Sequence, residues 1–303
     1  MNISAGILGT TVGPRVHDID ARWLMAYAGA LGETAPEYLD TTRAGGLLAH
    51  PLFPVCYEWP LAVDLRAKTL TDEIALRGVH ATHDLTLHRR PRSGDRLSTT
   101  ATITGVEPRP PGAYVVTRFE TLDADGRPVT TTDYGSLYLG VECESHPHPG
   151  PLPERERESN PLSPVGRGKG EGHGDEGRPP DWAADVPIPA NLAHVYTECA
   201  RIWNPIHTDR AVALGAGLPD IILHGTATLA LAVSEALRRQ PEGAAAAVAR
   251  IRCRFGGMVR LPSTLRVEGW KPTDAGSGRA VAFRAIGANG RPAVRDGWLH
   301  LAG

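Results

Sequence analysis

The stretch that decides the fold covers residues 199–233 and reads CARIWNPIHTDRAVALGAGLPDIILHGTATLALAV. It opens with polar residues around Asn204-Pro205, and an Asn-Pro pair is a common turn. His207 follows directly, and the pair His224-Gly225 comes later in the same stretch. From there small and apolar residues recur at helical spacing. The stretch therefore predicts a polar loop that leads into a buried helix.

Around this stretch the chain repeats itself. Residues 27–40, YAGALGETAPEYLD, align without a gap with residues 196–209, YTECARIWNPIHTD. The identical pairs, all at one constant offset, are Tyr27 with Tyr196, Pro36 with Pro205 and Asp40 with Asp209. Because the order of the surrounding segments repeats as well, the sequence indicates two related lobes.

The segments around the repeat predict an α+β fold. Each block follows a helical pattern and precedes a second helical stretch, at about Val55–Lys68 in the first half and from Gly225 onward in the second. Strand-like segments then cover 82–107, 114–141, 250–270 and 280–302, with hairpin turns at Asp-Ala-Asp-Gly and Ala-Asn-Gly. A long helix followed by an antiparallel meander, twice, predicts a double hot-dog, in which each sheet wraps round a central helix.

A segment rich in Pro and Gly marks the boundary between the two lobes. Residues 144–181 hold 8 Pro and 7 Gly in 38 positions, a composition with too few apolar groups to offset the entropy of ordering. We therefore expect lobes at 1–143 and 182–303 joined by a disordered linker at 144–181; a docking tail is the functional alternative for that segment.

The net charge and the spacing of the cysteines argue against several classes of function. The 303 residues carry 32 basic and 34 acidic side chains, a net charge of −2, which gives no field for nucleic acid or an anionic membrane. No basic leader or long apolar run is present, so we expect a cytoplasmic protein. The four cysteines form no C-x-x-C pair and are expected to be reduced core thiols, and we expect no metal and no cofactor. His80, His83 and His88 lack a compact spacing for metal ligands.

Residues 199–233 resemble the hydratase motif of the MaoC-like, R-specific enoyl-CoA hydratases. Residues 80–97, HATHDLTLHRRPRSGDRL, resemble the amino-terminal hot-dog of the two-lobed dehydratases of that superfamily. The resemblance implies a hydro-lyase that hydrates an enoyl thioester or dehydrates a 3-hydroxyacyl thioester. It also implies that the acyl group is carried on coenzyme A or an acyl carrier protein, and that two chains can form a homodimer.

The resemblance assigns roles to particular residues. His207 falls on the catalytic histidine, Asn204 on the asparagine that orients water, and Gly225 on the glycine whose N–H polarises the thioester carbonyl. The family's catalytic aspartate falls on Ile202, so His207 is expected to be the titrating group. Ile202, Trp203 and His224 are expected to contact substrate, with Ile202 and Trp203 lining a dry pocket that lowers the pKa of the nearby histidine.

The first lobe keeps the carboxylate position of the motif but lacks the other two polar residues. Glu33 occupies the carboxylate position, but Ala35 and Tyr38 replace the asparagine and the histidine. We therefore place the chemistry in the second lobe and expect Glu33 to be a solvated or capping carboxylate.

Several alternatives remain open at this stage. The chain can be a hot-dog thioesterase, a non-catalytic partner that binds acyl thioesters, or an enzyme of a divergent elimination. His207 can be structural, Asn204 a cap before Pro205, and His224 a cap or a packed side chain of the central helix. A core role is expected for Tyr196, since Tyr27 repeats it.

Overall fold

The structure, a computed structural model, describes residues 1–144, 178–241, 243–276 and 278–303. The predicted linker falls mostly on residues 145–177, which lie outside the described part of the chain. The strands of the first lobe are β1 (Asn2–Ile3), β2 (Thr11–Asp18), β3 (Gly78–Leu87), β4 (Arg96–Arg109), β5 (Gly112–Leu122), β6 (Pro128–Leu139) and β7 (Glu142–Cys143). Its helices are η1 (Ala5–Ile7), α1 (Ala21–Ala30), α2 (Pro36–Leu39), α3 (Pro54–Thr69) and α4 (Asp72–Ala75).

The second lobe follows the same order. Its strands are β8 (Trp182–Ile188), β9 (Val248–Phe255), β10 (Ser263–Gly269), β11 (Thr273–Ala275), β12 (Gly278–Ile286) and β13 (Pro292–Ala302). Its helices are α6 (Leu192–Ala200), η2 (Pro205–His207), α7 (Arg210–Gly215), α8 (Gly225–Leu237) and η3 (Ala244–Ala247).

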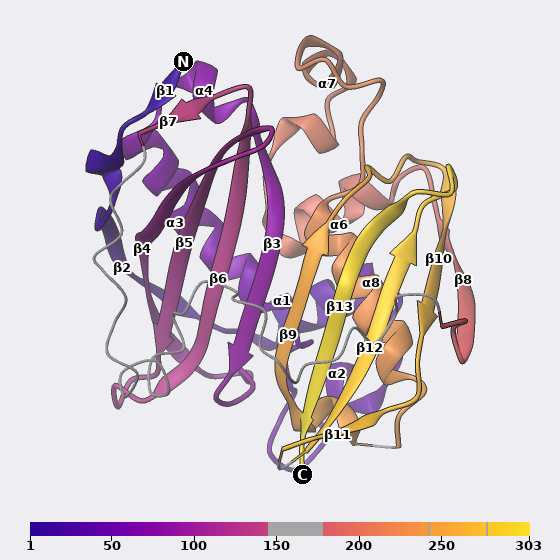
Figure 1. The fold of residues 1–303 in the computed structure, drawn as a ribbon. Helices are drawn as coiled ribbons and strands as arrows, with labels where there is room; N and C mark the ends of the chain where they lie inside the picture. Colours follow the sequence, from indigo (N-terminus) through magenta and orange to yellow (C-terminus); the bar gives the residue numbers. More distant parts are fainter. Residues whose placement is uncertain (145–177, 242, 277) are drawn as a thin grey trace.

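One continuous sheet joins the lobes. In the described part of the chain its order is β2-β4-β5-β6-β3-β9-β13-β12-β10-β8, with β11 beside β12. The two halves of this order mirror each other, because β2, β4, β5, β6 and β3 correspond to β8, β10, β12, β13 and β9. Strands β3 and β9 pair antiparallel at the seam, where Leu85 faces Ile251. The long helices α3 and α8 lie behind the sheet (Figure 1), so the predicted double hot-dog is confirmed.

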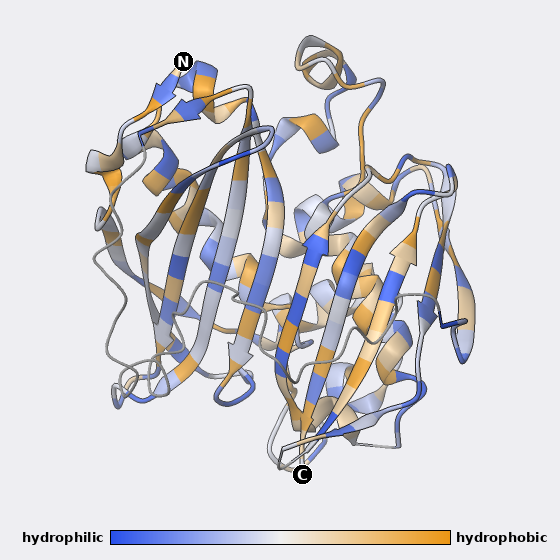
Figure 2. Ribbon diagram, in the orientation of Figure 1, coloured by the Kyte–Doolittle hydropathy of each residue, from blue (hydrophilic) through white to orange (hydrophobic). Residues whose placement is uncertain are grey.

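Alternating side chains explain why these segments form strands. Along β4 the residues Leu97, Thr99, Ala101 and Ile103 are buried, while the positions between them are more exposed. Such a period of two places one face of the sheet on the helices and the other toward solvent. Hydrophilic and hydrophobic residues alternate along β9 and β13 in the same way (Figure 2).

Helix α8 is the central helix of the second lobe. Every residue from Ala227 to Ser234 is buried, and a helix that is apolar on all sides belongs inside a core. Helix α3 takes the same place in the first lobe and buries Tyr57, Leu61 and Leu65. No helix in the described ranges is long and apolar enough to cross a membrane.

The repeated tyrosines meet where the two lobes join. The hydroxyls of Tyr27 and Tyr196 lie 3.3 Å apart, and both side chains are fully buried. The Tyr27 hydroxyl also lies within hydrogen-bonding distance of the Leu52 carbonyl, at 3.3 Å. The core role expected for Tyr196 is confirmed, and the contact ties together the two copies of the repeat.

Two sequence expectations need correction. The edge strands β2 and β8 were not predicted. Strand β2 exposes most of its residues and lacks a clear apolar alternation, whereas β8 does alternate but is only seven residues long and directly follows the Pro- and Gly-rich segment. Of the four free cysteines, Cys56 and Cys253 are buried as expected. Cys143 and Cys199 are only partly buried, so they are not core thiols.

Candidate active site

The loop after α6 places the candidate catalytic residues. Helix α6 ends at Ala200, and the next residue, Arg201, has a left-handed φ of 58° that turns the chain sharply. Asn204 then precedes Pro205 at the first position of the short helix η2, where the fixed φ of proline suits a helix start. The backbone N–H of His207 donates to the Asn204 carbonyl over 3.1 Å, which closes this turn.

A backbone carbonyl fixes the tautomer of His207. Its Nδ1 lies 2.8 Å from the carbonyl oxygen of Ile222, which can only accept, so Nδ1 carries the proton. In the neutral ring Nε2 then keeps its lone pair, and it makes no hydrogen bond to any described residue. Burial lowers the pKa of His207 to about 4, and the bond to Ile222 opposes that shift. His207 is therefore a neutral base near pH 7.

His224 packs directly on this ring. The centroids of the His207 and His224 rings are 3.7 Å apart, and their planes differ by 27°. His224 Nε2 lies 3.1 Å from the hydroxyl of Thr197, whereas its buried Nδ1 has no hydrogen-bond partner in the described residues. Burial, together with repulsion from His207, holds the pKa of His224 well below its usual value. His224 thus packs against the ring of His207 and does not cap α8 with its side chain.

Gly225 is the first residue of α8. Its N–H is one of the orphan donors of the helix start, since the first backbone bond within the helix runs from Thr228 to the His224 carbonyl. A Cβ at Gly225 would lie 3.4 Å from the ring of Phe255, so the backbone runs close to β9. The helix dipole adds positive potential at this end. The start of α8 therefore presents a backbone N–H that has no acceptor within the helix, close to the ring of Phe255.

An open depression of about 400 Å³ lies over the same loop and is lined by Trp203 and Asn204, together with residues of α6. The Trp203 side chain is 61% exposed, so it offers an aromatic surface to a ligand. The Asn204 side chain makes no capping hydrogen bond, which removes capping as the reason for this residue.

The Ile202 side chain is buried. It is 4% exposed, belongs to the main hydrophobic core and does not line the depression, so its contact with substrate stays a prediction. No carboxylate appears among the causes that shift the pKa of His207. Burial and the Ile222 carbonyl, and not a carboxylate, therefore set the protonation state of His207.

The first-lobe counterpart is a closed polar cluster. Glu33 is 8% exposed and lies 3.9 Å from Nε2 of His50 and 3.5 Å from the guanidinium of Arg238. The expectation of a solvated carboxylate was wrong, because the end of α8 covers this side chain. His50 also lies 3.1 Å from Ser234 of α8, so the cluster joins the two lobes.

The sequence did not reveal three participants in the site. Thr197 stands one turn before the loop and gives no motif signal, although it bonds His224. The Ile222 carbonyl acts through the backbone, which no side-chain pattern encodes. Thr226 lies 3.1 Å from the Tyr196 hydroxyl and so anchors the start of α8 to the repeated tyrosines.

Comparison with family models agrees with this two-lobed arrangement. Residues 173–284 match the model described as MaoC like domain. Residues 7–132 match the model described as FAS1-like, dehydratase domain region.

Two curated relatives share part of the sequence. Enoyl-CoA hydratase ChsH3 of Mycobacterium tuberculosis is 35% identical over 94 residues, which cover 31% of this chain and 32% of that protein. Peroxisomal multifunctional enzyme type 2 of Drosophila melanogaster is 36% identical over 83 residues, 27% of this chain and 13% of that protein. The matched part of the chain thus spans less than a third of the length of each relative.

Solved structures share the fold over nearly the whole chain. A MaoC-like dehydratase from Phytophthora capsici superposes with a TM-score of 0.76 at 19% identity and covers 98% of this chain and 96% of its own. The full-length Drosophila enzyme gives 0.72 at 24% identity, over 95% of this chain and 48% of its own. Residues 7–132 thus match a FAS1-like dehydratase region and residues 173–284 a MaoC like domain, in a chain that folds as a double hot-dog.

Proposed function

We propose that the chain adds water to an enoyl thioester, or removes it from a 3-hydroxyacyl thioester, at the loop of His207. The observation that carries the proposal is the 2.8 Å contact between His207 Nδ1 and the Ile222 carbonyl. It leaves Nε2 as a lone-pair base on a ring stacked against the residue that precedes Gly225. The relative named an enoyl-CoA hydratase supports the same reaction class.

The reaction needs one base, one oxyanion donor and one held water. In the direction of hydration, Nε2 of His207 removes a proton from a water molecule that Asn204 orients, and the water oxygen bonds to the β-carbon. The electrons of the double bond move onto the thioester oxygen, which accepts a hydrogen bond from the Gly225 N–H. The imidazolium then gives its proton to the α-carbon, so His207 serves as base and acid in turn. Dehydration is the reverse.

His207 and the Gly225 N–H are each expected to raise the rate by an amount typical of their proposed roles. A positioned acid–base group supplies about 10² to 10⁴ in rate. An oxyanion donor at a helix start supplies about 10² to 10³. The substrate is proposed to be an acyl thioester of coenzyme A or an acyl carrier protein, held in part by the exposed face of Trp203.

The direct test is turnover by the purified full chain. Loss of the enoyl absorbance of a short 2-enoyl-CoA, with a 3-hydroxyacyl-CoA as the product found by mass spectrometry, is the expected result. Release of free thiol from a saturated acyl-CoA would indicate thioester hydrolysis in its place. Tight binding of acyl-CoA with neither reaction would indicate a non-catalytic partner, a role compatible with isoleucine at position 202.

Two further expectations belong to the same proposal. The lobes at 1–143 and 182–303 are proposed to act as one unit, because the β3–β9 pairing and the tyrosine contact join them. A homodimer of such chains is proposed as well, and light scattering coupled to size exclusion measures it directly.

A further inference from the structure

Three hydroxyl groups form a chain of contacts between the central helices of the two lobes. The Tyr27 hydroxyl lies 3.3 Å from the Leu52 carbonyl, just before α3, and 3.3 Å from the Tyr196 hydroxyl. The Tyr196 hydroxyl donates to Thr226 Oγ1 over 3.1 Å, in the first turn of α8. The tyrosines come from α1 and α6, which pack against each other where the lobes meet (Figure 1). We call Tyr27, Tyr196 and Thr226 the hydroxyl chain.

The hydroxyl chain also touches the pair of stacked histidines. The ring centroids of Tyr196 and His224 are 5.0 Å apart, and His224 stacks on His207 at 3.7 Å. Thr226, the partner of the Tyr196 hydroxyl, directly follows Gly225 in the sequence. Tyr196 therefore contacts both the ring stack of the candidate site and the helix start that carries the proposed oxyanion donor.

The first lobe has the same framework without the donor. Leu48 and Ile222 each form an isolated antiparallel bridge two residues before a histidine, so His50 corresponds to His224. The residue after His50 is Pro51, and proline has no N–H to offer to a thioester oxygen. The first lobe therefore carries the tyrosine of the repeat although the start of its own central helix lacks the donor of the second lobe.

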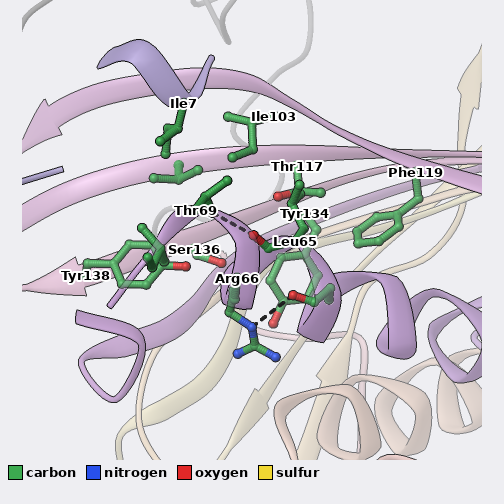
Figure 3. A pocket seen from close by; sticks show the side chains of 13 residues that line it. Ile7, Leu65, Arg66, Thr69, Ile103, Thr117, Phe119, Tyr134, Ser136 and Tyr138 are labelled. Carbon is green, nitrogen blue, oxygen red and sulfur yellow. Dashed lines mark hydrogen bonds between the residues drawn. The ribbon is translucent and has the colours of Figure 1, made fainter. Parts of the chain in front are cut away.

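The cavity of the first lobe is too small to hold an acyl chain. It lies between α3 and the first-lobe strands (Figure 3), and its volume is about 20 Å³, room for about one water molecule. Leu65, Thr117 and Tyr138 are among its lining residues, whereas neither tyrosine of the hydroxyl chain lines it. Direct contacts between the lobes, and not this cavity, are thus the route by which the first lobe can act on the second-lobe site.

Both tyrosine hydroxyls stay neutral. The two side chains are fully buried, and burial raises the pKa of Tyr27 and of Tyr196 above the usual value. A buried hydroxyl that loses its partner finds no water to replace it, so the observed contacts are favoured over other arrangements. Neutral hydroxyls of this kind are suited to holding neighbouring groups in place, and not to acid–base chemistry near pH 7.

We propose that Tyr27 and Tyr196 are positioning residues, whose hydroxyls fix the start of α8 so that the Gly225 N–H points at the thioester oxygen. The inference rests on the proposed function, because it takes that N–H to be the oxyanion donor. The contact at Thr226 restrains the backbone one residue away from the donor. A misplacement of about 1 Å caused by a change far from the chemistry can lower a rate by about 10². The first lobe thereby controls the rate of the reaction in the second lobe.

The test removes each hydroxyl and keeps its ring. Tyr196→Phe should lower kcat on a short 2-enoyl-CoA by about tenfold or more, and Tyr27→Phe by about threefold or more. KM should stay nearly unchanged in both variants, because the donor acts mainly on the oxygen of the transition state. The double variant should lose no more than Tyr196→Phe alone, since Tyr27 acts on α8 through the Tyr196 hydroxyl.

Tyr57→Phe is the matched control. Tyr57 is also fully buried, and its hydroxyl lies 2.9 Å from Thr130 Oγ1 within the first lobe. Its loss should lower the melting temperature about as much as Tyr196→Phe does, while kcat changes less than about twofold. An equal loss of kcat in Tyr57→Phe and Tyr196→Phe would assign the effect to general destabilisation and would overturn the inference.

Hydrogen exchange gives an answer that does not depend on turnover. The Thr228 amide donates to the His224 carbonyl over 3.0 Å at the start of α8, and Ala232 in the middle of the same helix serves as the internal reference. The exchange rate of Thr228 relative to Ala232 should rise about threefold or more in Tyr196→Phe and stay unchanged in Tyr57→Phe.

Either of two results would overturn the inference: unchanged kcat in Tyr196→Phe, or unchanged relative exchange at Thr228 in that variant. Failure of the unaltered chain to hydrate any 2-enoyl-CoA would refute the proposed function. The exchange experiment would still decide whether the hydroxyl chain holds the start of α8.

Discussion

The rings of His207 and His224 stack with their centroids 3.7 Å apart, although the whole of α7 lies between them in the sequence. Two imidazolium ions at this distance repel each other, and burial penalises each charge further. The pair therefore stays neutral over the physiological range. A neutral His207 with its proton on Nδ1 is the form that the proposed mechanism requires.

The pH dependence of the reaction follows from this pair. Because His207 has a pKa of about 4 and acts first as a base, activity is present above that value and is lost as pH falls through it. We expect kcat/KM to be flat from about pH 6 to 8 and to reach half its plateau near pH 4, for a chain that circular dichroism shows to be folded at each pH. A midpoint near 6.5, the value of an ordinary histidine, would contradict the buried stack.

A substitution at Gly225 can remove its backbone N–H, the proposed oxyanion donor, without breaking helix α8. Proline is favoured at the first position of a helix, and His224 before it has an extended ψ of 137°, which proline tolerates. Gly225→Pro lacks the N–H and should lower kcat by about 10² to 10³. Gly225→Ala keeps the N–H and meets Phe255 at 3.4 Å, so it should lose much less. Equal losses in the two variants would show that the N–H is not the donor.

Substitution of Trp203 tests whether the depression binds the substrate. Because its side chain is 61% exposed, Trp203→Ala should leave the melting temperature nearly unchanged. If the ring contacts substrate equally before and during the reaction, KM rises severalfold while kcat is unchanged. Steady-state kinetics on an enoyl-CoA measure both constants. Unchanged KM would remove Trp203 from the binding surface.

The buried carboxyl of Glu58, outside the candidate active site, is expected to make the stability of the fold depend on pH. Burial raises the pKa of Glu58 to about 8, and the Thr132 hydroxyl donates to its Oε1 over 2.6 Å. A folded-state pKa above the unfolded value means that the unfolded chain loses its proton first, so stability falls as pH rises from about 4.5 to 8. Glu58→Gln keeps the acceptor and removes this cost. Denaturant unfolding should show stabilisation by a few kcal/mol at pH 8 and little change at pH 4.5.

Strong local patterns made much of the fold predictable. The recurrence of residues 27–40 at 196–209 and the alternating strands implied two hot-dogs, and the apolar run after Gly225 marked the start of α8 correctly. The edge strand β2 was not predicted, because it exposes most of its residues and so needs no apolar alternation. Strand β8 alternates, but it is short and directly follows the Pro- and Gly-rich segment.

Candidate site residues could be predicted only where a motif marks their positions, and their roles stay predictions. His207, Asn204 and Gly225 follow from their motif positions. The burial of Ile202 and Glu33 depends on packing between segments far apart in the sequence, which no local pattern records. The tautomer of His207 depends on the backbone carbonyl of Ile222, which lies beyond α7 in the chain.

The hydration rate of the purified chain on a short 2-enoyl-CoA, with and without the His207 imidazole, tests the central claim most directly. His88→Ala is the control, since it removes an exposed imidazole next to the end of β3. The account predicts that His207→Ala lowers kcat by about 10² or more while His88→Ala keeps the full rate. Equal rates for His207→Ala and the unaltered chain would contradict it.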